Sequence, residues 1–592
     1  MSREKIFYLI VVAVMLVLLA GHISQYYFLT DDAFISFRYA DNLASGKGLV
    51  FNEGERVEGY TNFLWVIILF LFRLIGWPPE VTANILSMAL SAVLFGSVVY
   101  FGHRIFAVRR FDFFTLIAPL LVVLNRTYAV WSTGGLETKL FSFLIFPAVI
   151  LLVPFGEGGR PRYRLSALFF TLAALTRPEG ILLFGCFFGV RLLLDIRQKG
   201  HVKAILGASS IFVFIIGAHF VFRLLYYGYP FPNTFYAKVV DGWFEIGIRY
   251  LFQFVHEYGL YPGLLSLVFI FGRHYELRKR LILVFFLVPF VPYLVYLAYI
   301  GGDHFEFRPL DVMVPFLALA FQEGLRAFYR LADGCRSRLP AVGWTLYVVV
   351  LIFFYVVPGW LSHRNFPREY GSATAIRTSE RSGSVLSGWP GLAGYLGYLD
   401  RLHAVLAGNF AGIRQEEHRL AMEEVFAPQA HLMERALARG LLVPDDKISL
   451  WCVGIIPYRT GLETIDFLGL TDSHIAHRKR PEIPAKLLPS DRLLAHQRRP
   501  EWNYLVRRRV TFISTVPAKF FFPWSEFFDG DRLKYDRLND RTFLVPFDSH
   551  VFVFRSVWRP DYFEEVFARR GYDFLYKETG DSVFYFPAES EE

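Results

Sequence analysis

Long apolar runs alternate with short polar stretches along the first 361 residues of the 592-residue chain. A helix needs about 20 mostly apolar residues to cross a bilayer, with roughly 17 to 25 tolerated. The segments at 113–124, 165–176 and 261–272 are short, so either polar residues that face a cavity extend them or the count falls by two. The pattern predicts a polytopic α-helical membrane protein with about eleven transmembrane helices, over residues 6–21, 81–102, 113–124, 138–154, 165–176, 179–194, 204–227, 261–272, 281–300, 309–329 and 342–361.

Basic residues lie mainly in the short loops between these runs, which explains the net charge of +9 without a nucleic-acid partner. Such loops face the cytoplasm, so we predict that residues 6–21 cross outward as a retained anchor. Counting the apolar stretch 62–75 as a span would place Arg104, Arg109 and Arg110 outside. We therefore predict that this stretch lies along the membrane interface, within a first external loop of residues 24–80.

The remainder, residues 362–592, is rich in charged residues, His and Pro, and contains no apolar run of spanning length. It is predicted to be a soluble, extracytoplasmic, mixed α/β domain that follows a transmembrane catalytic domain of residues 1–361. The three cysteines lie far apart and imply no disulfide framework. Helical periodicity covers residues 416–438, and the composition of strands covers residues 447–456, 510–514 and 550–555.

Short polar segments rich in Gly and Pro all fall on the external side of this topology, and the internal loops hold nothing comparable. Ionisable residues at membrane depth are costly and are by default functional. The asymmetry predicts a functional site on the outer face of the membrane. The segments are residues 31–32, 53–62, 134–138, 176–180, 229–234 and 301–308.

Asp31 and Asp32 follow the first predicted span directly. Adjacent acids at this position either cap the helix expected over residues 33–43 or act as a general base, alone or as part of a metal-binding pair. A carboxylate suits the removal of a proton from a sugar hydroxyl that attacks an electrophile. Both interpretations are compatible with the residues alone.

The other polar segments also have a structural and a functional interpretation. Glu58, Tyr60 and Asn62 form either a sugar-binding rim or the polar end of an interfacial helix. Glu137 either binds the backbone of a neighbouring span or contributes to a site. A third choice concerns Arg177, which either pairs with the nearby Glu179 across Pro178 or holds a phosphate through its planar fork of donors.

The densest cluster follows a Gly-Gly bend and combines oxygen ligands, an imidazole and a cationic donor. We predict a function for it. Its members are Asp303, His304, Glu306 and Arg308.

The chain carries no phosphate-binding loop, dinucleotide fingerprint, zinc-ligand spacing or nucleophile elbow. An external active site also has no supply of nucleotide sugars, so glycosyl transfer there needs a sugar carried across the membrane on a lipid, such as a polyprenyl phosphate. The departing phosphate then needs an Arg, Lys, His or metal ion to stabilise its charge.

These segments resemble membrane glycosyltransferases of the GT-C class, in the subgroup that includes the mycobacterial terminal β-(1→2)-arabinofuranosyltransferase. The resemblance is carried by residues 31–40 (DDAFISFRYA), 48–52 (GLVFN) and 58–65 (EGYTNFLW). The later motifs at 134–138, 176–180, 229–234, 301–308, 465–472 and 475–476 extend it over residues 5–480.

The resemblance implies a GT-C fold, a polyprenyl-phosphate sugar donor, inversion at the anomeric carbon and a catalytic aspartate at Asp31 or Asp32. Arabinofuranose is the leading candidate for the sugar, and the acceptor is expected to be a glycan or glycolipid of the cell envelope. If a divalent metal ion takes part, its expected ligands are Asp31, Asp32, Asp303 and His304. The residues expected to bind donor or acceptor are Arg38, Glu58, Tyr60, Asn62, Glu137, Arg177, Glu179, Asn233, Lys238, Asp303, His304, Glu306 and Arg308.

Two other classes of protein remain open. A transporter or flippase of lipid-linked sugars also carries charges in its spans, but it commonly has internal repeats and a site near the bilayer midplane. A catalytically inactive relative would serve as a glycan-binding scaffold. The absence of a visible repeat and the one-sided motifs favour an enzyme of the bacterial inner membrane, with its active site and C-terminal domain extracytoplasmic.

Overall fold

A computed structural model describes most of the chain, and the structural statements that follow concern these residues. The predicted span over 342–361 and the predicted domain boundary at 361/362 lie outside them. The described residues are 3–108, 112–154, 159–238, 242–334, 394, 397, 401, 415–478, 498–516, 518–529, 532–534, 542–558 and 560–577.

Four of the described helices are long and apolar enough to cross a membrane, and a bent pair makes a fifth if it counts as one span. The bent pair joins α12 (Phe244–Glu257) to Tyr261–Phe271 at an angle of 88°. The chain is therefore a multi-pass membrane protein, and the number eleven stays a prediction. The four are α1 (Arg3–Ser24), α4 (Pro79–Phe106), α10 (Lys199–Tyr227) and the stretch Leu277–Tyr299, which contains α14 (Leu277–Leu287), η3 (Val288–Phe290) and α15 (Val291–Tyr299).

Shorter helices pack between the long ones at most of the other predicted positions. They include α3 (Phe63–Leu74), where an interfacial helix is predicted; its 12 residues are too few to cross a bilayer. The others are η1 (Phe113–Leu116), α5 (Ile117–Leu124), α6 (Arg126–Val130), α7 (Thr138–Ile150), α8 (Tyr163–Thr176), α9 (Glu179–Asp195), α13 (Tyr261–Ser266), η2 (Leu267–Phe271), η4 (Arg308–Met313) and α16 (Val314–Gly334).

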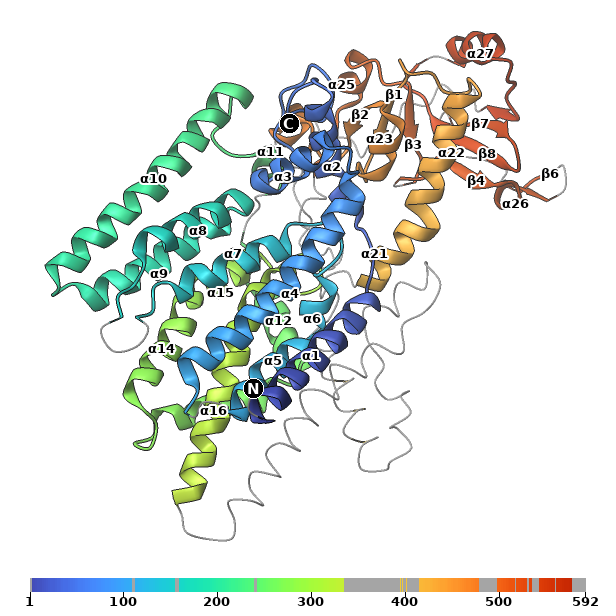
Figure 1. Ribbon diagram of the computed structural model, residues 1–592. Coiled ribbons are helices and arrows are strands. Elements are labelled where there is room, and N and C mark those ends of the chain that lie inside the picture. The colour runs from blue at the N-terminus through green and yellow to red at the C-terminus, as the bar shows by residue number, and fades with distance from the viewer. Residues whose placement is uncertain are drawn as a thin grey trace.

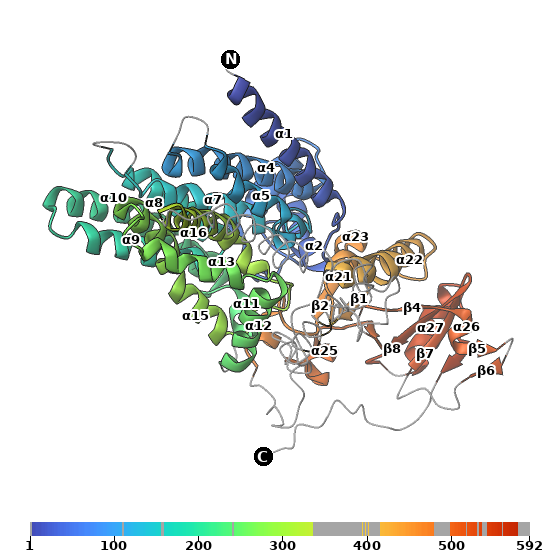
Figure 2. The same ribbon diagram turned by 90° about the horizontal axis from the view of Figure 1, so that it is seen from below.

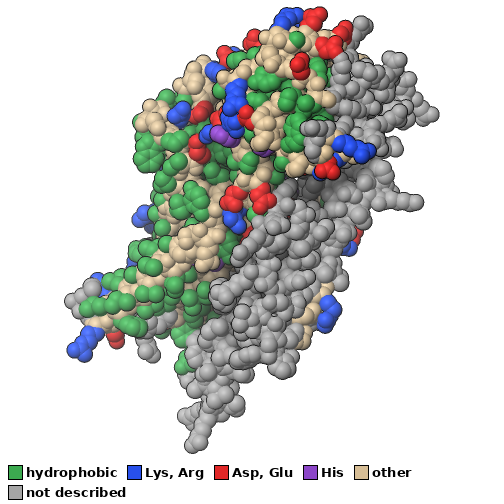
Figure 3. Space-filling view, turned by 90° about the vertical axis from the view of Figure 1, so that its right-hand side faces the viewer, with side chains coloured by type: hydrophobic (Ala, Val, Ile, Leu, Met, Phe, Trp, Pro, Cys, Tyr) green, Lys and Arg blue, Asp and Glu red, His purple; other side chains and the backbone are tan. Residues whose placement is uncertain are grey.

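The polar segments predicted to share one side of the membrane meet at one end of the helix bundle. There α2 (Asp31–Ala44) and α11 (Asn233–Lys238) lie beside the C-terminal region, whereas the amino terminus of α1 lies at the opposite end (Figure 1). Backbone hydrogen bonds join the segments, from Thr30 N–H to the Gly134 carbonyl at 3.1 Å and from Asn233 N–H to the Glu58 carbonyl at 2.9 Å. Lys, Arg, Asp and Glu gather toward this end, while apolar side chains cover much of the described bundle (Figure 3).

The C-terminal region contains a mixed sheet of seven strands in the order β2-β1-β3-β8-β7-β9, with β4 paired to β8. The first three strands in this order run parallel, and the remaining pairs are antiparallel. The region lies beside the membrane helices (Figure 2). The strands are β1 (Lys447–Leu450), β2 (Glu463–Asp466), β3 (Phe512–Ser514), β4 (Phe521–Pro523), β7 (Thr542–Phe547), β8 (His550–Arg555) and β9 (Tyr576–Lys577), with a separate hairpin of β5 (Phe528–Asp529) and β6 (Arg532–Leu533).

Helices flank this sheet and join it to the membrane bundle. The helix predicted over 416–438 is confirmed as α21 (Gln415–Ala421) and α22 (Ala427–Ala438), joined by a π-helical turn. One continuous cluster of buried apolar side chains runs from the membrane helices into this region, so the two parts share a core. The remaining helices are α23 (Ile455–Thr460), α24 (Ser473–Ala476), α25 (Trp502–Arg507), α26 (Trp524–Phe527) and α27 (Pro560–Arg569).

The strand predicted over 447–456 is too long. β1 ends at Leu450, and Ile455 and Ile456 begin α23 instead. Pro457 has no N–H to donate to a sheet, which stops a strand but is tolerated in the first turn of a helix. The loop between β1 and α23 is thereby freed to contact α2, and this contact shapes the functional site.

Candidate active site

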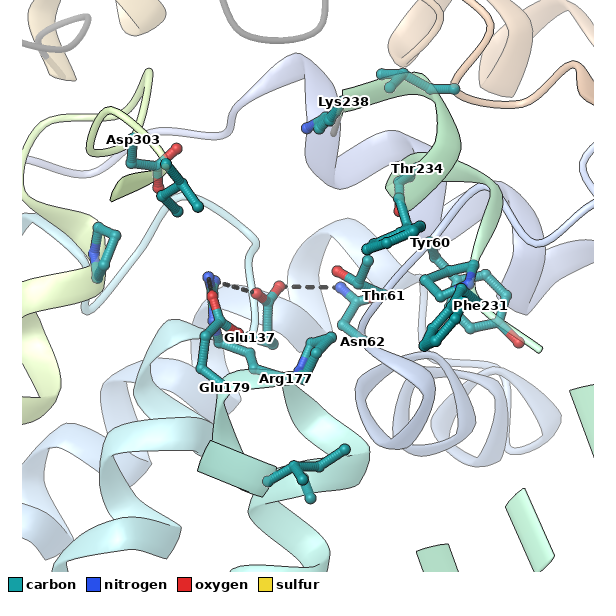
Figure 4. Close-up of a pocket in the computed structure, with 18 of the residues that line it drawn as sticks. Tyr60, Thr61, Asn62, Glu137, Arg177, Glu179, Phe231, Thr234, Lys238 and Asp303 are labelled. Carbon is teal, nitrogen blue, oxygen red and sulfur yellow. Dashed lines mark hydrogen bonds and ion pairs between the residues drawn. The ribbon is translucent and has the colours of Figure 1, made fainter. Parts of the chain in front are cut away.

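A cavity of about 490 Å³ lies where α2, α11 and the loop 301–308 meet the ends of α8, α9, α10 and α15. Most of the residues predicted for the site line it, from six separate segments of the chain. Figure 4 labels seven of these residues. The predicted residues that line the cavity are Asp32, Tyr60, Asn62, Glu137, Arg177, Glu179, Lys238, Asp303, His304 and Arg308.

Helix α2 lies between the cavity and the start of α23 in the C-terminal region. Successive residues of an α-helix point about 100° apart, because 3.6 residues make one turn. Asp32, Ile35 and Ser36 therefore share one face, and all three line the cavity. Asp31 and Arg38 lie on another face, against the C-terminal region. The two acids predicted as a pair consequently point in different directions.

Asp32 is the first member of a chain of charged groups. Its carboxylate lies 3.6 Å from His304 Nε2, and His304 Nδ1 lies 3.2 Å from an Asp303 oxygen. The other oxygen of Asp303 accepts a hydrogen bond of 2.9 Å from Arg308 Nε. The side chain of Asp32 is 38% exposed, whereas those of His304, Asp303 and Arg308 are 11–15% exposed. The exposed end of this chain is therefore a carboxylate that faces the cavity.

The loop that holds His304 needs its two glycines. Gly301 and Gly302 have φ values of 86° and 84°, in the left-handed region that favours glycine. A Cβ atom on Gly302 would lie 2.6 Å from the ring of Tyr250. The close packing of this bend against α12 fixes where His304 enters the cavity.

The charges around Asp32 keep it ionised. Burial opposes its ionisation, but the nearby His304, together with the charges of Lys238 and Arg308, outweighs this effect and lowers the pKa of Asp32 below its ordinary value. Burial also opposes protonation of His304, yet the adjacent carboxylates of Asp303 and Asp32 raise its pKa above the ordinary value. The two shifts favour an ionised aspartate beside a protonated imidazole.

A second polar group lines the cavity beside the first. Arg177 Nη1 donates to Glu137 at 2.7 Å, and its Nη2 donates to Glu179 at 2.8 Å. The other oxygen of Glu137 accepts from Asn62 Nδ2 at 3.0 Å (Figure 4). Arg177 therefore pairs with Glu179, as one interpretation of the sequence predicts, and it also binds Glu137. With both guanidinium amino groups engaged, Arg177 is less available to an anion than its position suggests.

Lys238 and Arg308 are more available. Among the described residues, no hydrogen bond or ion pair holds the Lys238 ammonium, which lies at the end of α11 and faces the cavity. Arg308 binds Asp303 through Nε, and its guanidinium packs 4.4 Å from the centre of the Phe305 ring. The cavity thus contains two cations that can bind an anion beside the Asp32 carboxylate.

Five predicted residues lie outside the cavity lining and have protein partners. Asp31, Arg38 and Asn233 bind the C-terminal region: Arg38 donates to the carbonyls of Pro457 and Leu462, and Asn233 donates to those of Gly469 and Leu470. Glu58 accepts from Arg223 at 2.9 Å, and Glu306 accepts from Arg126 at 2.6 Å. These side chains hold the walls of the cavity together.

Sequence reasoning missed Arg223 and His219, which line the cavity from α10. Both fall inside the apolar run predicted as the span over 204–227, and a charged side chain in such a run is itself a signal of a site. It also missed Arg126, whose partners are distant in sequence.

The residues predicted as metal ligands do not form a ligand set. Asp31 points away from the other three, toward the C-terminal region. Within the described parts of the chain, no group of three or more His, Cys, Asp or Glu side chains is placed to hold a metal ion.

Together, the apolar helices and the cavity define a multi-pass membrane protein with a charged site at one end of its helix bundle. The predicted resemblance to terminal arabinofuranosyltransferases is confirmed by comparison with known proteins. The chain is 30% identical over 249 residues to the terminal beta-(1->2)-arabinofuranosyltransferase of Mycobacterium tuberculosis, and 30% identical over 262 residues to that of Corynebacterium glutamicum. These matches cover 40% of this chain and 39% and 37% of the two relatives, so the chain spans well under half of the length of either.

The C-terminal region matches a family described as a domain of unknown function (DUF8728) over residues 413–575. Among solved structures, the chain is similar to ArnT from Cupriavidus metallidurans bound to undecaprenyl phosphate, at 14% identity and a TM-score of 0.47. That match covers 78% of this chain and 86% of the other.

Proposed function

We propose that the chain is an inverting GT-C glycosyltransferase on the outer face of the bacterial inner membrane. It moves a sugar, with arabinofuranose the leading candidate, from a polyprenyl-phosphate donor to a glycan or glycolipid of the cell envelope. The observation that carries this proposal is the exposed Asp32 carboxylate, which shares a cavity at the end of the membrane helices with the cations of His304, Lys238 and Arg308. The similarity to arabinofuranosyltransferases supports the choice of sugar.

In the proposed reaction Asp32 is the general base. An acceptor hydroxyl oxygen attacks the anomeric carbon of the donor sugar and gives its proton to the Asp32 carboxylate. The bond between the anomeric carbon and the phosphate oxygen breaks, and that oxygen leaves with the electron pair. Attack opposite the departing phosphate inverts the anomeric carbon. Cations close to the phosphate oxygen stabilise the charge that develops on it.

The geometry favours Asp32 over Asp31 as the base. A base must come within hydrogen-bond reach of the proton that it removes, and Asp32 is the member of the pair that lines the cavity. Both oxygens of Asp31 accept backbone N–H groups at 2.9 Å. Burial, with the neighbouring charge of Asp32 adding to it, raises the pKa of Asp31 to about 7, so its carboxyl group has the pKa of a base without access to a substrate.

Lys238 is expected to bind the phosphate of the lipid. Replacing Lys238 by alanine should weaken the binding of decaprenyl phosphate about tenfold or more, because a hydrogen bond to a charged group contributes about 1.5–3 kcal/mol. Binding to the purified protein in detergent can be measured by microscale thermophoresis. Lys47→Ala is the matched control, since Lys47 is exposed and pairs with Glu53 at 3.2 Å. Equal affinities for both variants would contradict this role of Lys238.

The rate of transfer should fall on the alkaline side, because His304 must be an imidazolium to pair with Asp32 and face the phosphate. Its raised pKa means that this charge persists above pH 6.5 and is lost as the pH rises through the higher value. Asp32, with its lowered pKa, stays ionised throughout this range. In a pH profile of kcat, the variant His304→Gln should be slower and should lack the alkaline decline. An unchanged decline would assign it to another group.

The function is tested by direct transfer. Purified protein is incubated with decaprenylphosphoryl arabinofuranose and a synthetic arabinofuranose oligosaccharide, and the product is analysed by mass spectrometry and NMR. Extension of the acceptor by one sugar with inverted anomeric configuration supports the proposal. Movement of the lipid across a proteoliposome without transfer would instead indicate a flippase, and binding of the oligosaccharide without either event would indicate a scaffold.

A further inference from the structure

The two neighbouring acids at the start of α2 have different surroundings. Asp31 Oδ2 accepts the N–H of Gly454 and Asp31 Oδ1 accepts the N–H of Ile455, each at 2.9 Å. In the C-terminal region, more than 400 positions away in the chain, Gly454 directly precedes α23 and Ile455 begins it. Asp31 thus connects the start of α2 directly to the C-terminal region, one residue before the proposed base.

The backbone of Gly454 packs directly against Asp31. A Cβ atom on Gly454 would lie 1.9 Å from the backbone oxygen of Asp31 and 2.5 Å from its carboxyl carbon. The approach of Asp31 therefore requires a glycine at this position.

A second contact lies two turns further along the same face of α2. Arg38 donates to the carbonyls of Pro457 and Leu462, at either end of α23, and it is 6% exposed. Positions i and i+7 of a helix share a face, so Asp31 and Arg38 together hold α23 against α2. The adjacent face, about 100° around the helix, carries Asp32 into the cavity. A shift of α23 would therefore rotate or displace the helix that aims the base.

We propose that Asp31 is a positioning residue, which holds the loop between β1 and α23 of the C-terminal region against α2 and thereby aims Asp32 into the cavity. The inference rests on the proposed function, because it gives the C-terminal region a part in the same reaction. A displacement of about 1 Å in a reacting group can cost on the order of 100-fold in rate. The C-terminal region then acts on catalysis through the position of α2, in addition to Leu470, which it places in the cavity lining.

The test is a double-mutant cycle between the two sides of the contact. In Asp31→Asn one oxygen still accepts a backbone N–H, but the amide NH2 group that replaces the other oxygen cannot accept one. Gly454→Ala introduces the Cβ atom that collides with Asp31. The full-length protein is assayed with decaprenylphosphoryl arabinofuranose and an arabinofuranose oligosaccharide. Each single variant should lower kcat by roughly 10- to 100-fold while KM for the lipid stays within about twofold, since neither residue lines the cavity.

The double variant should be no slower than the slower single variant, because both changes break one contact. The rate of hydrogen exchange of the backbone amides at positions 454 and 455 should rise in both single variants. Asp445→Asn, at an exposed aspartate of the C-terminal region, is the matched control and should retain both the wild-type rate and the wild-type exchange.

Three results would overturn the inference while leaving the proposed function intact. These are multiplicative losses in the double variant, a full rate in Gly454→Ala, or an Asp31→Asn variant that is inactive with unchanged exchange of both amides. The last result would make Asp31 a catalytic group. Absence of turnover by the wild-type protein would instead refute the proposed function, and the role assigned to Asp31 with it, whatever the exchange data show.

Discussion

Replacing Asp32 by asparagine should slow glycosyl transfer by about 10²- to 10⁴-fold, the range that a general base contributes to an enzymatic reaction. The amide cannot take the proton from the acceptor hydroxyl, yet it has nearly the shape of the carboxylate. The carboxylate is the exposed end of the chain that runs through His304 and Asp303 to Arg308. The other three groups orient it and balance its charge.

The experiment separates chemistry from binding. Asp32→Asn should bind decaprenyl phosphate at least as well as the wild type, because removing a negative charge from the cavity favours an anion. Asp445→Asn serves as the control for a change from Asp to Asn at an exposed position. Transfer is followed in single turnovers with decaprenylphosphoryl arabinofuranose. A variant that retains more than about a tenth of the wild-type rate would exclude Asp32 as the base, given the range above.

That the polar segments lie together on one side of the membrane could be predicted, because this prediction requires only the positions of the basic residues along the sequence. Basic loops mark one side of the membrane, and everything between alternate spans then falls on the other side. The contact of Asp32 with His304 at 3.6 Å joins segments about 270 positions apart that this rule had placed together. A miscount of two spans would have left the grouping unchanged, which is why the result does not depend on the number eleven.

The separate surroundings of Asp31 and Asp32 could not be predicted. Both acids stand in the first turn of α2 and look alike in the sequence. Their difference arises from what packs on each face of the helix, and the partner of Asp31 is the backbone of a loop that the composition assigns to a strand. A backbone N–H is present at almost every residue, so the sequence marks neither Gly454 nor Ile455 as its partner.

Buried ion pairs over long distances are hidden for the same reason. Arg126 binds Glu306 and Glu416, which follow it by 180 and 290 positions. The sequence shows that Arg126 lies between two predicted spans, but it does not indicate which acidic residues pair with it. Glu306 was therefore predicted as a ligand-binding residue, although its side chain is fully buried against Arg126.

Replacing Arg126 by methionine should destabilise the protein by about 3–5 kcal/mol, the cost of breaking a buried ion pair by removing one partner. Arg126 is 1% exposed and donates to both oxygens of Glu306, at 2.6 and 2.9 Å, and to both oxygens of Glu416, at 2.9 and 2.8 Å. Without the guanidinium, two carboxylates lie close together with no cation between them. Methionine keeps most of the length of the side chain, so the loss is mainly one of charge.

The matched control is Arg459→Met, because Arg459 pairs with Glu434 at the surface, where such a pair contributes about 0–1 kcal/mol. Thermal unfolding in detergent should place the midpoint of Arg126→Met well below that of the control. Adding Glu306→Gln and Glu416→Gln to Arg126→Met should restore much of the loss, since it removes the unpaired charges. Similar midpoints for the two single variants would show that the buried group is not needed for stability.

The same variant should also affect the active site. Glu416 belongs to α21 of the C-terminal region, and Glu306 stands two residues after His304, so Arg126 fixes the loop 301–308 to that region. Arg126 is thus a second connection between the C-terminal region and the cavity, on the side of His304, as Asp31 is on the side of Asp32. If both connections hold the charged groups in place, Arg126→Met should lower kcat even at temperatures where it is fully folded. A folded variant with the wild-type rate would limit the role of the C-terminal region to the contact at Asp31.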